Sequence, residues 1–219
     1  MLAKPKMPFV FVELAAVSVL AFLAFCYGEI AGLFSRHMII HIILMTIAAP
    51  VLASLLQKSA YSVTPLISIR SLAASTILQM ALFFAWHSPP GWAAIGQGND
   101  AIMQATLFFS ALWFWLTVFT QASRHLWRTV AALLLTGKLF CLIAVLLTFA
   151  PRVLHGAVAS GLASADDLAD QQLAGLLMIS VCPLTYVLAA IVLISRWFHA
   201  LSDVRDDRMP AVVNSESRS

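Results

Sequence analysis

The stretch from His37 to Gln57 reads HMIIHIILMTIAAPVLASLLQ and contains no Asp, Glu, Lys or Arg. A helix needs ~20 predominantly apolar residues to cross the hydrocarbon core of a bilayer, and this stretch has that length and composition. Because lipid offers no water to backbone N–H and C=O groups, a spanning segment must be a helix or part of a closed barrel. The stretch therefore predicts a transmembrane helix.

The composition of the whole chain agrees with this assignment. Of the 219 residues, 61% are hydrophobic and only 11% are charged, whereas a soluble domain is typically about 25% charged. The net charge of +3 comes from basic residues scattered over short polar joints, which is the pattern of membrane topology. We therefore expect the lipid bilayer, and no nucleic acid, as the surroundings of this protein.

Five further apolar runs are separated from this one and from each other by polar or turn-rich joints. The six expected spans are residues 7–27, 37–57, 71–86, 101–121, 127–150 and 172–198. They predict an all-α, polytopic transmembrane bundle that forms a single domain over residues 1–199. Residues 200–219 are polar and lack apolar periodicity, which predicts a flexible tail.

The distribution of Lys and Arg predicts the orientation of the bundle. With six spans, both termini and the second and fourth joints lie on one side of the membrane. That side carries ten of the thirteen basic residues: Lys4, Lys6, Lys58, Arg70, Arg124, Arg128, Arg196, Arg205, Arg208 and Arg218. The opposite side carries Arg36 and Arg152. Since basic residues accumulate in cytoplasmic loops, both termini are expected in the cytoplasm.

Histidines gather at the opposite, outer face. His37 and His41 are four residues apart, which places them on one helix face about 6 Å apart along the axis. At a helix N-terminus the macrodipole disfavours imidazolium, and neutral imidazole is the form that binds a metal ion. His87 ends the third span and precedes Pro89 and Pro90, which stop the helix there.

Other potential ligands lie near the same face. Asp170 opens the sixth span, Met45 follows His41 by one turn, and Met103 lies near the outer end of the fourth span. Imidazole binds either oxidation state of copper, and thioether selects Cu(I). The candidate copper ligands are His37, His41, His87, Asp170, Met45 and Met103.

Each of these residues also has a structural explanation. The histidines can form hydrogen bonds between helices, Asp170 can be a helix N-cap, and the methionines can be packing residues. Histidines on different helices at similar depth can also ligate haem, as in a membrane cytochrome. No catalytic nucleophile, phosphate-binding loop or acid–base pair is recognisable, so we do not expect an enzyme.

Three motifs resemble a known family. Residues 34–41, FSRHMIIH, with Met45 and the run APVL at residues 49–52, resemble the first signature of the CtaG family of cytochrome c oxidase assembly factors. This is the polytopic family found with caa-type oxidases. Residues 86–90, WHSPP, resemble its second signature, and residues 170–178, DQQLAGLLM, resemble its third.

The resemblance implies an integral membrane factor for oxidase maturation in a bacterial inner membrane. It implies a role in copper supply, with oxidase subunits and a periplasmic copper donor as partners. The polar positions of the family fall on His37, His41, His87 and Asp170. Many members carry a histidine in the next helix, where this chain has Met103 and Gln104. The alternatives to copper delivery are a haem-binding redox protein and a metal-free scaffold for oxidase subunits.

Overall fold

The described part of the chain is a bundle of helices. The computed structural model describes residues 24, 27, 28, 32–58, 69–88, 90–92, 99–154 and 164–216. These ranges contain no strand, and five helical segments within them are long and apolar enough to cross a membrane. The expected all-α, membrane-spanning class is confirmed for these ranges. The first expected span, 7–27, lies outside them apart from residues 24 and 27.

The observed helices follow the expected spans closely. In chain order they are α2 Leu33–Ile43, the π-helical segment η2 Leu44–Ala48, α3 Ala49–Lys58, α4 Ile69–Trp86, α6 Asp100–Gln121, α7 Leu126–Phe149 and α8 Ala165–Glu216. Helices α4, α6 and α7 begin one or two residues before the expected starts. The first described span begins at Leu33, four residues before the expected start, so His37 lies inside a helix.

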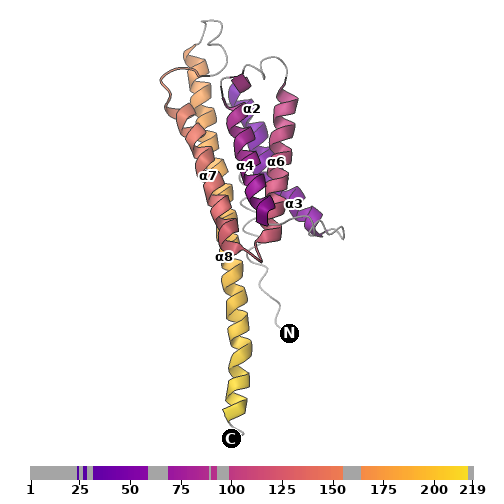
Figure 1. Ribbon diagram of the computed structural model, residues 1–219. Helices are drawn as coiled ribbons and strands as arrows, with labels where there is room; N and C mark the ends of the chain where they lie inside the picture. The colour runs from indigo at the N-terminus through magenta and orange to yellow at the C-terminus, as the bar shows by residue number, and fades with distance from the viewer. Residues whose placement is uncertain are drawn as a thin grey trace.

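Helix α8 is much longer than expected. It runs for 52 residues, and its C-terminal part projects well beyond the other helices (Figure 1). The backbone is helical to Glu216, and the flexibility expected of residues 200–219 stays a prediction. Adding residues to an existing helix costs much less free energy than nucleating a new one. A search for apolar periodicity does not detect such an extension into polar residues.

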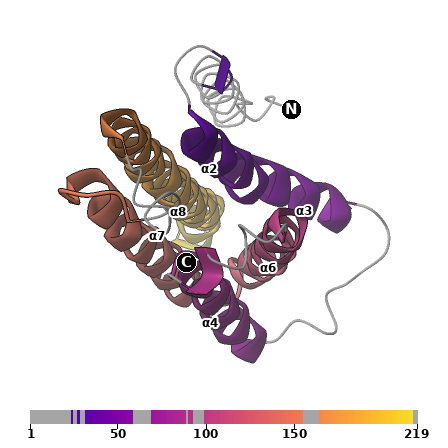
Figure 2. The same ribbon diagram turned by 90° about the horizontal axis from the view of Figure 1, so that it is seen from above.

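The helices close into a ring. Helix α7 packs along α8, α4 packs between α7 and α6, and α3 packs against α6. Helix α2 packs against α8. Because α2, η2 and α3 follow one another without a break, they form one continuous rod that connects α8 to α6 and closes the ring (Figure 2).

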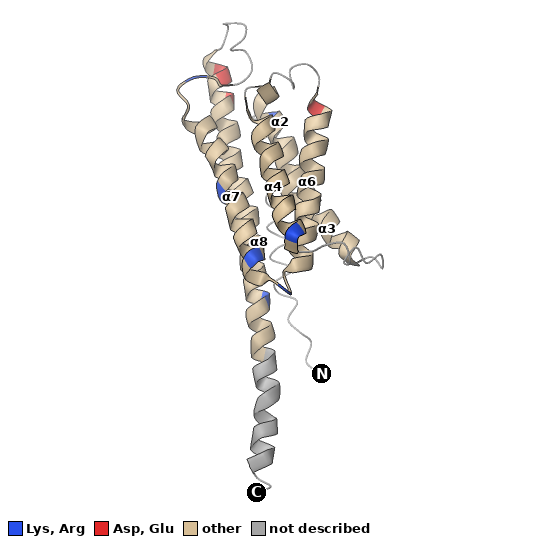
Figure 3. Ribbon diagram, in the orientation of Figure 1, with Lys and Arg blue, Asp and Glu red and all other residues tan. Residues whose placement is uncertain are grey.

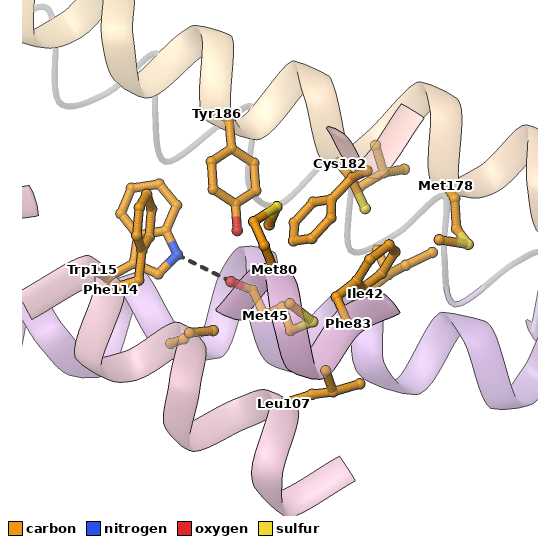
Figure 4. Packing of buried hydrophobic residues seen from close by; sticks show 14 of the residues in the cluster. Ile42, Met45, Met80, Phe83, Leu107, Phe114, Trp115, Met178, Cys182 and Tyr186 are labelled. Carbon is orange, nitrogen blue, oxygen red and sulfur yellow. Dashed lines mark hydrogen bonds between the residues drawn. The ribbon is translucent and has the colours of Figure 1, made fainter. Parts of the chain in front are cut away.

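The centre of the ring is filled by aromatic side chains. Trp115, Tyr186, Phe83, Phe114 and Phe140 are the largest of the fully buried side chains (Figure 4). The rings of Trp115 and Tyr186 stack with their centroids 5.3 Å apart. The hydroxyl of Tyr186 accepts a hydrogen bond from the side-chain amide of Gln79 on α4, at 2.8 Å. Helices α4, α6 and α8 therefore meet through one tightly packed layer.

Pro50 lies just after the π-helical segment. In η2 the N–H of Ala49 donates to the carbonyl of Leu44, five residues back. The same pattern would direct the N–H of residue 50 to the carbonyl of Met45, but proline has no N–H. The indole N–H of Trp115 on α6 donates to the Met45 carbonyl instead, at 3.1 Å (Figure 4). A side chain of another helix thus satisfies a backbone group that the proline leaves unpaired.

Charged side chains divide between the two ends of the bundle (Figure 3). Asp100 begins α6, and Asp166, Asp167 and Asp170 lie in the first turns of α8. Most described basic residues lie toward the other end, at the start of α4, the turn after α6, the start of α7 and the lower part of α8: Arg70, Arg124, Arg128 and Arg196. The ends of α2, α4, α6 and α8 that carry the candidate ligands belong to the acidic end.

Candidate metal site

The structure brings the three candidate histidine ligands together. His37 and His41 lie on α2, with ring centroids 5.8 Å apart and their planes nearly perpendicular. His87 follows the last residue of α4, and its ring centroid lies 5.4 Å from that of His41. His41 is therefore the middle ring of a row of three, here called the histidine row.

His37 has a partner at each ring nitrogen. Its Nδ1 lies 3.3 Å from Oδ1 of Asp100, and its Nε2 lies 3.3 Å from the sulfur of Met103. A carboxylate only accepts hydrogen bonds, so a proton on Nδ1 would point to Asp100. A thioether sulfur also only accepts, so the neutral ring donates either to Asp100 from Nδ1 or to Met103 from Nε2, and the tautomer decides which.

His87 is held in one tautomer by the backbone. Its Nδ1 lies 2.7 Å from the carbonyl oxygen of Phe83, and its backbone N–H donates to the same oxygen at 3.1 Å. Because a carbonyl oxygen only accepts, Nδ1 carries the proton and Nε2 carries the lone pair of the neutral ring. A hydrogen bond from one ring nitrogen to a carbonyl or carboxylate is the usual support of a metal-binding histidine. His87 has such support, and His37 has a carboxylate 3.3 Å from its Nδ1.

His41 is the unusual member of the row. Its side chain is 1% exposed, and neither ring nitrogen has a hydrogen-bond partner within the described ranges. The side-chain oxygen of Gln104, on the adjoining helix α6, is also buried without a partner in the same part of the chain. Burying a polar group without a hydrogen bond costs about 1–3 kcal/mol in proteins. These atoms are the buried groups that a bound ion or water would satisfy.

The two methionines differ in their positions. Met103 is fully buried, and its sulfur contacts His37. Met45 is also buried, but its side chain lies in the apolar cluster with Ile42, Phe83 and Leu107 (Figure 4). Met103 is thus in place to act as a ligand beside the row, whereas Met45 lies among packing residues.

Asp170 contacts the start of α2. Its Oδ1 accepts hydrogen bonds from the backbone N–H groups of Gly32 at 3.0 Å and Ser35 at 3.2 Å, and its Oδ2 accepts one from Phe34 at 2.9 Å. The carboxylate of α8 therefore binds the start of the helix that carries His37 and His41. The last residue it contacts, Ser35, precedes His37 by two positions.

Several residues of the site were missed by the sequence reasoning. Asp100 supports His37, and the ring of Trp92 lies against His37 with a centroid separation of 5.4 Å. The side-chain amide of Gln104 donates to the His37 carbonyl at 3.5 Å. Asp100 and Gln104 lie close to Met103 in the sequence at the start of α6. This proximity to a candidate ligand is the pattern that could have identified them. The Phe83 carbonyl has no signature in the sequence.

The donors do not form a ready-made coordination shell. In the described part of the chain, no group of three or more His, Cys, Asp or Glu side chains is arranged to hold a metal ion. The separations nevertheless fit shared ligation. The separation of 3.3 Å between His37 Nε2 and Met103 Sδ is short enough for the two atoms to share one ion. An ion bound by this pair needs side-chain rotation before His41 or His87 can join.

The fold and the site define a polytopic helical membrane protein with a buried histidine and thioether cluster near one end of the bundle. Residues 8–200 match the family model described as cytochrome c oxidase caa3 assembly factor, Caa3_CtaG. The chain belongs to this family, which confirms the resemblance of its three motifs. No curated protein and no solved structure matches the chain.

Proposed function

We propose that this oxidase assembly factor binds copper as a cargo at the histidine row and Met103, and delivers it to a nascent subunit of cytochrome c oxidase. Membership of the assembly-factor family supports the role in maturation. The buried, unsatisfied ring of His41 between two other histidines supports the binding of an ion. This ring is the observation that carries the proposal.

The chemistry of the donors suits transient binding of Cu(I). Imidazole and thioether are the ligands on offer, and thioether selects Cu(I) over harder cations. A hydrogen bond fixes the tautomer of His87 so that it presents a lone pair on Nε2, and Asp100 lies where it can orient the His37 ring in the same way. Met45 and Asp170 remain candidates for a transfer partner and for a residue that orients the ligands. A site assembled only after side-chain rotation holds its ion less tightly than a rigid one, which is what delivery requires.

The proposed location is the outer face of a bacterial inner membrane, with both termini in the cytoplasm. The basic residues near one end of the bundle support this orientation (Figure 3), because basic loops remain in the cytoplasm. The histidine row then faces the periplasm. A periplasmic copper donor and the oxidase subunits are the partners expected at that face.

The arrangement favours an ion over a haem. Two axial histidines of a haem lie on opposite faces of the porphyrin. The rings of His41 and His87 meet edge to face at 5.4 Å, and Phe83 covers the His87 ring with a centroid separation of 4.2 Å. The copper measurement also distinguishes the two alternatives, a haem protein and a metal-free scaffold.

The test is copper stoichiometry of the purified protein under reducing and oxidising conditions. Wild type is compared with a His37→Ala/His41→Ala/His87→Ala variant. A matched control, His125→Ala/His199→Ala, removes two exposed histidines away from the row. We expect about one copper per chain in wild type and in the control, and none in the triple variant.

Three other results would contradict the proposal. Equal copper in wild type and in the folded triple variant would place binding elsewhere. A Soret band after expression with haem would favour the redox protein. Wild type that binds no copper would leave an assembly factor that acts as a scaffold.

A further inference from the structure

Helix α2 begins without a cap of its own. Its N-cap residue is Gly32, and no side-chain hydrogen bond from that position caps the helix. The first N–H groups of a helix have no partner within the helix, and a Ser, Thr, Asp or Asn at the N-cap normally accepts from them. The helix that carries His37 and His41 therefore needs an acceptor from another part of the chain.

Asp170 supplies this acceptor from α8, 138 residues away along the chain. Its carboxylate takes the N–H groups of Gly32, Phe34 and Ser35 at 2.9–3.2 Å. The hydroxyl of Ser35 in turn donates to the Asp170 carbonyl at 2.8 Å. A carboxylate at a helix N-terminus is also favoured by the macrodipole. The contact is thus reciprocal and involves the backbone of both helices.

Gly32 is shaped for this contact. A Cβ atom at this position would overlap all three atoms of the Asp170 carboxylate group. The backbone of Gly32 is extended, with a φ of −72°, so conformational freedom does not require glycine here. The close approach of the carboxylate requires it.

The next residue of α8 binds another helix end. Gln171 is 1% exposed, and its side-chain oxygen accepts the N–H of Leu154 at 2.6 Å. Its amide group donates to the carbonyls of Leu147 and Arg152, both at 3.3 Å. Two consecutive residues of α8 therefore fix the start of α2 and the end of α7. Helix α8 therefore holds both neighbouring helices in place at this end of the bundle.

We propose that Asp170 is a positioning residue that sets the height and rotation of α2 against α8, and so aligns His37 and His41 with His87 and Met103. His37 follows Ser35 by two residues within one rigid helix, so a displacement of the helix start moves both histidines. Asp170 then acts through α2 and is not itself a ligand of the ion. The copper readout of this inference rests on the proposed function, while its structural readout does not.

The first experiment measures amide hydrogen exchange of wild type and Asp170→Ala in nanodiscs. The amides of Gly32, Phe34 and Ser35 are expected to exchange at least about tenfold faster in the variant, because they lose their acceptor. Asp166→Ala removes an exposed carboxylate four residues earlier on the same helix and should leave these amides unchanged. Unchanged exchange in Asp170→Ala would overturn the proposal, whether or not the protein binds copper.

The second experiment separates positioning from capping and from ligation. Copper affinity should fall by roughly 10–100-fold in Asp170→Ala, as for other residues that orient metal ligands. In Gly32→Ser/Asp170→Ala the new serine can cap α2 locally but cannot bind it to α8. We expect slow exchange to return in this double variant while copper affinity stays low.

Two copper results would overturn the inference. Full recovery of affinity in the double variant would mean that capping alone is needed. Complete loss of copper from a folded Asp170→Asn, which keeps one oxygen acceptor, would make Asp170 a ligand. Wild type that binds no copper refutes the proposed function, and the exchange experiment then decides the role of Asp170 alone.

Discussion

Trp115 donates its indole N–H to the backbone carbonyl of Met45, at 3.1 Å. This hydrogen bond replaces the backbone N–H that Pro50 lacks. The bond joins α6 to the rod that carries His37 and His41. The Trp115 ring also stacks on Tyr186 of α8. One side chain thus connects the irregular turn below the histidine row to two neighbouring helices.

Replacing Trp115 by Phe should destabilise the protein. The variant keeps an aromatic ring but leaves the buried Met45 carbonyl without its donor, which costs about 1–3 kcal/mol. Thermal unfolding in detergent measures the effect. Trp113→Phe is the matched control, since Trp113 lies on the same helix but is exposed, and it should change the unfolding temperature little. Equal effects of the two substitutions would contradict the role of the indole N–H.

Replacing Pro50 by Ala should rescue the Trp115 variant. Alanine restores an N–H that can reach the Met45 carbonyl, so Pro50→Ala/Trp115→Phe should be more stable than the sum of the single effects. Residues that share a partner typically couple by about 0.5–3 kcal/mol. A thermodynamic cycle of the four proteins measures this coupling, and strict additivity would show that the two residues do not share the Met45 carbonyl.

Replacing Met103 by Leu should weaken Cu(I) binding selectively. The change removes the thioether 3.3 Å from His37 Nε2 and roughly keeps the side-chain volume, so the fold should tolerate it. We expect a loss of about tenfold for Cu(I), equivalent to ~1.4 kcal/mol, and little change for Cu(II). Competition with chelators specific for each oxidation state measures both affinities. Met178→Leu, a buried methionine on α8, is the control, and an equal loss in both variants would indicate packing only.

Reporter fusions should define the orientation of the bundle. A reporter fused after Ser219 should be active in the cytoplasm, and one inserted between residues 155 and 163 should be active outside. Both follow from the clustering of basic residues at one end. The reverse pattern would place the histidine row on the cytoplasmic face and would exclude delivery of copper to the periplasmic side.

Local patterns in the chain were sufficient for much of the fold. The described helices follow the apolar runs because hydropathy is a property of consecutive residues, and lipid requires helical backbone wherever a run is long enough. The shared face of His37 and His41 follows from the helical repeat in the same way. Hydropathy did not predict that α8 continues to Glu216.

Tertiary structure decided how the site is assembled. Only packing of the helices places Asp100 and Met103 beside His37 and leaves both ring nitrogens of His41 without a hydrogen bond in the described ranges. Asp170 illustrates the limit of local reasoning most clearly, because it was expected at the N-cap of its own helix or at the metal. It caps a helix 135–138 residues away. Its partners depend on the rotation and height of two helices, and these are set by side-chain packing across the whole bundle.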